Sequence, residues 1–188
     1  MTTPQHRRPV VGVMGSSTRA YEDLAEPLGR WLASAGVHLL TGGGVGTMEA
    51  VSRAFAAVRP RAGLVVGVLP ADLPDGIAVP RAGYPNPSVE LAIFTHLPLS
   101  GLTGTDPRSR NHINILSSDV VIVLPGNEGT ESEMALAVRY GKPVIAFFGD
   151  HIVGWRPPEG VPVARTMAEV EEFVSNAIKQ RAAASRRP

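Results

Sequence analysis

The chain has 188 residues, with 18 basic and 17 acidic side chains and a formal net charge of +1. This length suits one domain with its own core, and the balanced charge gives no general reason to expect a nucleic-acid or membrane-surface partner. The sequence contains no cysteine, which excludes disulfides, thiolate metal sites and cysteine nucleophiles. We therefore expect a cytoplasmic protein that recognises its partner at a local site.

The polar N-terminus leads into an apolar run of about six residues, shorter than a signal-peptide core or a membrane span. The C-terminal RAAASRRP is also polar and is expected to fray. We predict one domain over residues 10–181, with flexible tails over residues 1–9 and 182–188.

Six short apolar runs, rich in valine, isoleucine and leucine, predict strands. They begin at Val10, Val37, Leu64, Val89, Asp119 and Pro143. The runs are continuous rather than alternating, which is typical of strands buried on both faces.

Helical patterns separate these strands. They cover residues 21–35, 48–58, 132–140 and 169–181. Gly36 and Gly141 follow two of them as stop signals. Strands that alternate with helices predict right-handed crossovers. The expected fold class is therefore α/β, a single doubly wound Rossmann-like domain with a mostly parallel central sheet flanked by helices.

The proline-rich stretch from Pro70 to Gly104 interrupts this alternation. A long turn-rich segment inside a compact domain is typical of a lid or a binding loop. The sequence does not indicate what this segment covers.

Glycine-rich turns follow the first, second and fifth predicted strands. Ligands of open parallel sheets bind outside the carboxyl ends of the strands, where helix N-termini present free N–H groups. Glycine lets the backbone approach an anion closely, and serine and threonine add hydroxyl donors. Strand-to-helix turns favour these residues for structural reasons too, but three such turns at one sheet edge favour a phosphate site. Its candidate residues are Gly15, Ser16, Ser17, Gly42, Gly43, Gly44, Pro125, Gly126, Gly129 and Thr130.

Two common nucleotide motifs are missing. The first turn lacks the third glycine of the dinucleotide fingerprint, and no Gly-Lys-Ser/Thr of a P-loop occurs, which argues against a nicotinamide enzyme and an ATPase. The 5 histidines are scattered without paired spacing, so we expect no intrinsic metal site.

The chain resembles the Rossmann-type superfamily that includes the Lonely Guy cytokinin-activating phosphoribohydrolases and the molybdenum cofactor carrier proteins. The matching pieces are VGVMGSS, LLTGGGVGTMEAVSRA, VVGVLP, SRNHINILSSDVVIVLPGNEGTESEMALA and GKPVIAFFG. They occur in family order over most of residues 10–149.

The hydrolase branch implies two catalytic residues. Arg110 takes the place of the family's arginine, and Glu133 takes the place of its glutamate. The resemblance implies cleavage of a nucleoside 5′-monophosphate to free base and ribose 5-phosphate, through an oxocarbenium-like state that Glu133 would stabilise. Asn111 stands where these enzymes have lysine, and Asn127 where they have a second glycine.

The chain resembles the carrier branch more closely than the hydrolase branch, through the segment from Arg110 to Ser118. This resemblance implies that a pterin phosphate is bound and handed on unchanged, with Asn114, Ser117 and Thr130 as polar contacts. The molybdenum cofactor (molybdopterin) is then the candidate carried ligand, and no intrinsic cofactor is expected. We prefer the carrier, with the phosphoribohydrolase as the alternative, so the sequence leaves open whether the protein is an enzyme.

Several residues have a structural interpretation as well. An acid such as Glu131 is favoured in the first turn of a helix by the helix dipole, and His112 without a visible partner is more often structural than catalytic. The resemblance also implies a homo-oligomer, a dimer or larger. Leu24, Leu28 and Trp31 fit either the core or a dimer surface.

Overall fold

A computed structural model describes residues 7–184. Seven parallel strands form the central sheet, in the order β6-β3-β2-β1-β7-β8-β9. Their bounds are β1 Val10–Met14, β2 His38–Thr41, β3 Val65–Leu69, β6 Leu91–Phe94, β7 Val120–Val123, β8 Val144–Phe147 and β9 Val163–Ala164. The six predicted strands are confirmed. Only β9 was not predicted, because two residues carry no readable pattern.

Within the described residues, four helices connect these strands and a fifth follows β9. They are α1 Glu22–Ser34, α2 Thr47–Ala57, α3 Asn111–Ser117, α4 Glu128–Arg139 and α5 Met167–Ala184. The prediction for α4 was too short, since this helix begins at Glu128 rather than Ser132. Asn127 and Gly129 suggested a loop in the sequence, but asparagine commonly precedes a helix and the first turn tolerates a glycine. The turn predicted to bind phosphate therefore includes the start of α4.

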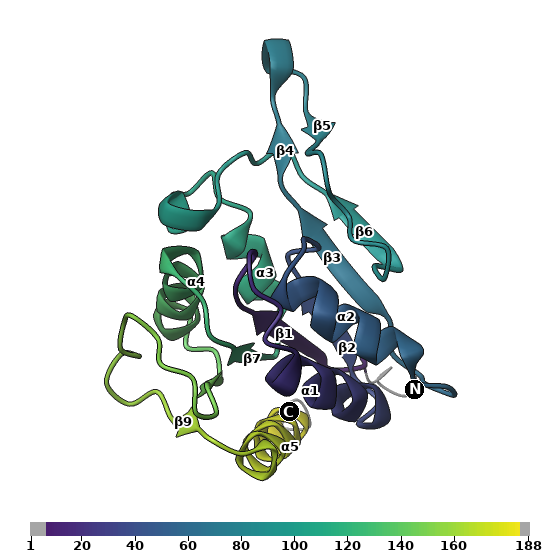
Figure 1. Ribbon diagram of the computed structural model, residues 1–188, viewed down its shortest axis with the longest axis vertical. Coiled ribbons are helices and arrows are strands. Elements are labelled where there is room, and N and C mark those ends of the chain that lie inside the picture. The colour runs from purple at the N-terminus through teal and green to yellow at the C-terminus, as the bar shows by residue number, and fades with distance from the viewer. Residues whose placement is uncertain (1–6, 185–188) are drawn as a thin grey trace.

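Alternate strand residues face opposite sides of the sheet and divide the core in two. One cluster packs the sheet against α1, α2 and α5, and the other packs it against α3 and α4 (Figure 1). Leu24 and Leu28 are buried in the first cluster, and Trp31 packs against it. Of the two interpretations of these residues, the core is the correct one. The layered arrangement confirms the doubly wound class.

The direction of winding reverses between β1 and β7. From β1 the chain winds outward to β2, β3 and β6, and it then returns to place β7, β8 and β9 on the other side. At such a reversal the loops after the two central strands part and leave a crevice. The Ser16 N–H donates to the Pro125 carbonyl at 3.2 Å, so the turns after β1 and β7 are adjacent.

A narrow arm replaces a helix in the connection between β3 and β6. It consists of β4 (Ala71–Asp72), the short 3-10 helix η1 (Pro74–Gly76) and β5 (Val79–Pro80), and it projects from the top of the domain in Figure 1. A second 3-10 helix, η2 (Gly101–Thr103), follows β6 and packs beside α4. The proline-rich stretch thus forms the arm, β6 and the η2 loop.

Residues 7–9, predicted to belong to the N-terminal tail, contact the domain. Arg7 pairs with Asp119 at 2.8 Å, and the Pro9 carbonyl accepts the His38 N–H at 2.8 Å. The C-terminal tail was predicted to begin at residue 182, but residues 182–184 continue α5. Residues 1–6 and 185–188 lie outside the described part of the chain.

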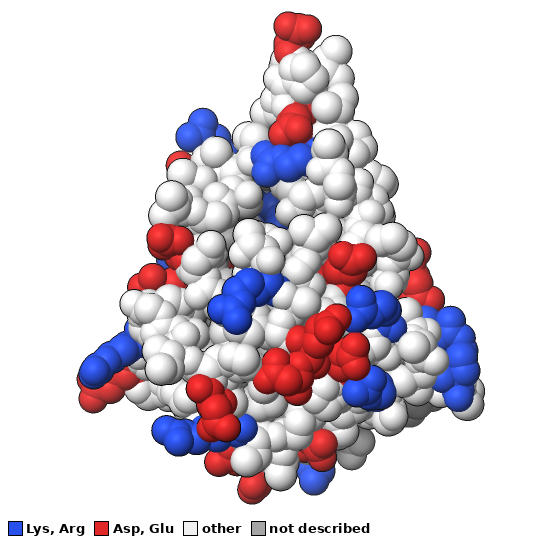
Figure 2. All heavy atoms as spheres, in the orientation of Figure 1, with Lys and Arg blue, Asp and Glu red and all other residues white. Residues whose placement is uncertain are grey.

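The surface matches the balanced composition. Acidic and basic side chains are interspersed on the face drawn in Figure 2, with no broad field of one sign. Among residues 7–184, no helix combines the length and apolarity needed to cross a membrane.

Candidate functional site

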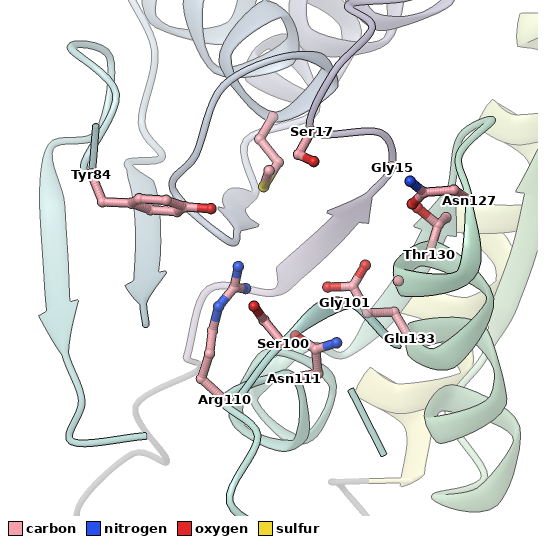
Figure 3. Close-up of a pocket in the computed structure, with 12 residues that line it drawn as sticks. Gly15, Ser17, Tyr84, Ser100, Gly101, Arg110, Asn111, Asn127, Thr130 and Glu133 are labelled. Carbon is pink, nitrogen blue, oxygen red and sulfur yellow. The ribbon is translucent and has the colours of Figure 1, made fainter. Parts of the chain in front are cut away.

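A cavity of about 120 Å³ lies where the turns after β1 and β7 meet the proline-rich segment. It is lined by Gly15, Ser17, Met48, Tyr84, Ser100, Gly101, Arg110, Asn111, Asn127, Gly129, Thr130 and Glu133 (Figure 3). The segments that provide these residues lie far apart in the sequence, and the winding reversal brings them together.

The structure separates the predicted site residues into two groups. Those that line the cavity are Gly15, Ser17, Arg110, Gly129, Thr130 and Glu133. Those that do not line it are Ser16, Gly42, Gly43, Gly44, Asn114, Pro125 and Gly126. Ser117, predicted as a polar contact, is exposed at the end of α3 and lines a different groove.

The Ser16 hydroxyl shapes the first turn. Its oxygen accepts the N–H groups of Thr18 and Arg19, each at 3.1 Å, while the Ser16 carbonyl accepts the Thr47 N–H at 2.9 Å. These bonds tie the loop after β1 to the start of α2. Of the two serines in this turn, Ser17 is the one that lines the cavity.

The glycines after β2 make room for other side chains. A Cβ atom on Gly42 would lie 2.4 Å from Nη1 of Arg110, and one on Gly44 would lie 2.8 Å from the Tyr84 hydroxyl. Gly43 has a positive φ of 73° and its N–H donates to Thr41 Oγ1 at 3.0 Å. The triple glycine therefore lets Arg110 and Tyr84 approach the backbone.

The turn after β7 keeps its carbonyl groups occupied. The Pro125 carbonyl accepts Ser16 N–H, the Gly126 carbonyl accepts the Trp155 indole N–H at 3.0 Å, and the Asn127 carbonyl accepts Thr130 N–H at 2.9 Å. By contrast, the described residues provide no acceptor for the N–H groups of residues 126–129. These donors lie at the positive end of the α4 dipole, where an anion is favoured.

Arg110, which lines the cavity, and the neighbouring Asn114 carry unpaired polar atoms. Arg110, the residue before α3, is only 4% exposed, and its Nε and Nη1 have no hydrogen-bond partner among the described residues. Both amide atoms of the buried Asn114, one turn later, also have none. Leaving a buried polar group unpaired costs about 1–3 kcal/mol. A polar ligand or ordered water would satisfy these groups.

Glu133 approaches Arg110 from α4. In Figure 3 the Glu133 carboxylate and the Arg110 guanidinium point into the same cavity from opposite walls. Burial raises the pKa of Glu133 to about 7. The charge of Arg110 and the Asn114 amide lower this pKa, because both favour the carboxylate, but the effect of burial is larger. The Asn114 amide favours the Glu133 carboxylate although no hydrogen bond of regular geometry joins the two groups. Near neutral pH, Glu133 is therefore able both to donate and to accept a proton.

His112 is part of the scaffold. Its Nδ1 lies 2.6 Å from the Tyr140 hydroxyl, and its Nε2 lies 3.0 Å from the Asp106 carbonyl. It links α3 and α4 to the loop after η2, which supports the structural interpretation. Glu131 is exposed in the first turns of α4 and does not line the cavity.

Sequence reasoning did not single out four of the residues that line the cavity. Tyr84, Ser100 and Gly101 come from the proline-rich segment, and Met48 comes from α2. In Figure 3 the Tyr84 ring extends from the segment between β5 and β6 toward the middle of the cavity, above Arg110. The only available signal was PRAGYPNP, a single aromatic residue within a turn-rich stretch.

Comparison with known proteins agrees with this architecture. The model of the SLOG cluster4 family matches residues 8–177. The molybdenum cofactor binding protein of Rippkaea orientalis has a TM-score of 0.71 and 31% identity, over 92% of this chain and 99% of that one. For the molybdenum cofactor carrier protein of Chlamydomonas reinhardtii, the TM-score is 0.68 and the identity is 28%, over 92% of this chain and 99% of that one. An uncharacterized protein of Archaeoglobus fulgidus is 29% identical over 175 residues, 90% of this chain and 97% of the relative.

Proposed function

Because this chain belongs to the SLOG cluster4 family, a Rossmann-like group near the molybdenum cofactor carriers, we propose that it is a carrier that binds a phosphorylated pterin-like molecule. The proposed cargo is the molybdenum cofactor, held at the carboxyl edge of the sheet and released unchanged. The observation that carries the proposal is the combination of free turn amides with the buried Arg110, whose Nε and Nη1 have no hydrogen-bond partner among the described residues.

The two ends of the cavity differ in chemistry. Asn127, Gly129 and Thr130 line one end of the cavity. The free amides of Asn127 and Gly129 and the Thr130 hydroxyl suit a phosphate group, since they are neutral donors at a helix N-terminus. At the other end, the Tyr84 ring, the Met48 thioether and the planar Arg110 guanidinium suit a flat heterocycle. A phosphorylated pterin has both parts.

The enclosed volume bears on the size of the ligand. Sites for drug-sized ligands measure about 300–1,000 Å³, whereas this cavity measures about 120 Å³. The cavity therefore suits the phosphate and the nearest ring atoms, and the rest of a pterin cofactor would lie beneath the arm and the η2 loop. This favours a ligand that remains partly accessible for transfer.

A phosphoribohydrolase is the second candidate, and Glu133 favours it. A carboxyl whose pKa is about 7 can accept a proton from an attacking water at neutral pH. Water oxygen would bond to the anomeric carbon while the bond to the base nitrogen breaks, and the base would leave after taking up a proton. Arg110 would hold the phosphate or the departing base.

Turnover separates the two candidates. We expect no free base when the purified protein is incubated with a panel of nucleoside 5′-monophosphates and analysed by liquid chromatography. We also expect saturable binding of molybdopterin. Base release that Glu133→Gln abolishes and Glu131→Gln preserves would replace the carrier with the hydrolase. Glu131 is the matched control because it lies on the same helix but outside the cavity.

Self-association is proposed from the resemblance to this superfamily. Leu91, Ile93 and Phe94 of the edge strand β6 are exposed, and strands of parallel sheets are usually covered on both faces. Light scattering after size exclusion is expected to give at least twice the chain mass of 19.8 kDa. A monomer at tens of micromolar protein would contradict this proposal.

A further inference from the structure

The peptide between Gly126 and Asn127 is held by a side chain that does not line the cavity. Its carbonyl accepts the Trp155 indole N–H at 3.0 Å, and Trp155 lies 29 residues further along the chain, in the loop after β8. Asn127 lines the cavity, whereas Trp155 does not. The two ends of one peptide group therefore face different surroundings.

The geometry of a trans peptide connects these ends. The C=O and the following N–H lie in one plane and point in opposite directions. When Trp155 draws the Gly126 carbonyl toward itself, the Asn127 N–H is directed away from Trp155, on the side where Asn127 lines the cavity. Trp155 thereby sets the direction of a donor that it never touches.

The local sequence makes this peptide easy to reverse. Glycine at position 126 tolerates a large change in ψ. Asn127 has a φ of −111°, and reversal would carry it to a positive φ, which asparagine tolerates better than most residues. A reversed peptide would turn a carbonyl oxygen toward the cavity and repel an anion. If the turn is to bind phosphate, a contact must therefore hold this peptide in one orientation.

Trp155 is well placed to provide that contact. Its ring packs edge-on against Phe148 of the second core cluster, with ring centroids 5.6 Å apart and planes at 85°. The indole is thus fixed by the core before any ligand arrives. We infer that Trp155 is a positioning residue of the anion site, which holds the Gly126–Asn127 peptide in the orientation that binds phosphate. This inference rests on the proposed function.

Trp155→Phe tests the inference, because it keeps an aromatic ring on Phe148 and removes the N–H donor together with part of the indole. Inorganic phosphate and a nucleoside 5′-monophosphate serve as probes, with dissociation constants measured by calorimetry. Loss of one oriented donor is expected to weaken binding about 10-fold, while the Tm of the ligand-free protein changes little. Trp31→Phe is the matched control, since Trp31 packs on the opposite face of the sheet, and it is expected to bind as the wild type does.

A second measurement on the wild-type protein separates positioning from general stability. The Trp155 indole N–H gives its own NMR resonance. Saturating phosphate is expected to slow the exchange of this proton with water, because the bound phosphate and the indole stabilise the same peptide orientation. Equal affinity of Trp155→Phe and the wild type, or an indole exchange rate that phosphate leaves unchanged, would overturn the inference and leave the proposed function standing. If the wild type binds none of phosphate, nucleotide and pterin, the proposed function fails, and the inference fails with it.

Discussion

Glu133→Gln is expected to stabilise the ligand-free protein by about 3 kcal/mol at pH 8 and to have almost no effect at pH 4. Burial raises the pKa of Glu133 from an ordinary 4.5 to about 7, and each pKa unit corresponds to about 1.4 kcal/mol. Between these two values the folded protein holds a proton that the unfolded chain has lost, so stability falls as pH rises. Glutamine stays neutral and removes this cost.

The measurement is thermal or denaturant unfolding of both proteins across this pH range, with the difference in Tm expected to reach about 5–10 °C at pH 8. Glu131→Gln controls for losing a charge from α4, because Glu131 is exposed on the same helix. Its effect on stability is expected to be small, because the side chain is exposed to water. A Glu133→Gln curve parallel to that of the wild type would show that Glu133 titrates normally and would remove the basis for its role as an acid or base.

Arg110→Met is expected to weaken binding of inorganic phosphate and of nucleoside 5′-monophosphates about 30- to 100-fold. A charge-assisted hydrogen bond contributes about 1.5–3 kcal/mol, and the two unpaired nitrogens of Arg110 are free to form such bonds with a ligand. At pH 6, where Glu133 is mostly protonated, the same change is expected to leave the ligand-free protein about as stable as before, since it removes a buried cation with unsatisfied donors. Calorimetry and unfolding of one sample report both effects.

Arg110→Lys distinguishes the charge from the shape of this group. Lysine keeps the charge but not the planar fork, so we expect it to recover only part of the affinity. Because the charge of Arg110 lowers the pKa of Glu133, NMR titration of Arg110→Met is expected to show this pKa rising further. Phosphate affinity equal to that of the wild type in Arg110→Met would place the bound anion away from Arg110.

These expectations combine in one physical picture of the site. Ligand-free, the cavity holds an unsatisfied cation and a carboxyl that is costly to ionise. An anionic ligand would pair with Arg110 and favour protonated Glu133, so binding would lower the cost of both. Sites that bind strongly are often less stable than they could be when empty. The lower stability of the ligand-free site is consistent with a binding function.

Local sequence patterns were sufficient for the fold class. Continuous apolar runs determine buried strands, and helical spacing between them determines the crossovers, because both depend on neighbours close in the chain. The glycine-rich turns after β1, β2 and β7 then had to lie at one sheet edge. Arg110 and Glu133 followed from a resemblance to known motifs rather than from any local pattern. Misjudging the start of α4 was a local error, caused by turn-forming residues at a helix N-terminus.

Only the tertiary structure decided what most of these residues do. Gly42 and Gly44 were predicted to bind phosphate, yet they accommodate Arg110 and Tyr84, which approach from other segments. The pKa of Glu133 depends on burial that no short window of sequence reveals. Trp155 acts on Gly126 across 29 residues of chain. The physical reason is the same throughout: strand and helix formation follow from chain neighbours, whereas desolvation and side-chain contacts depend on segments that only the folded sheet brings together.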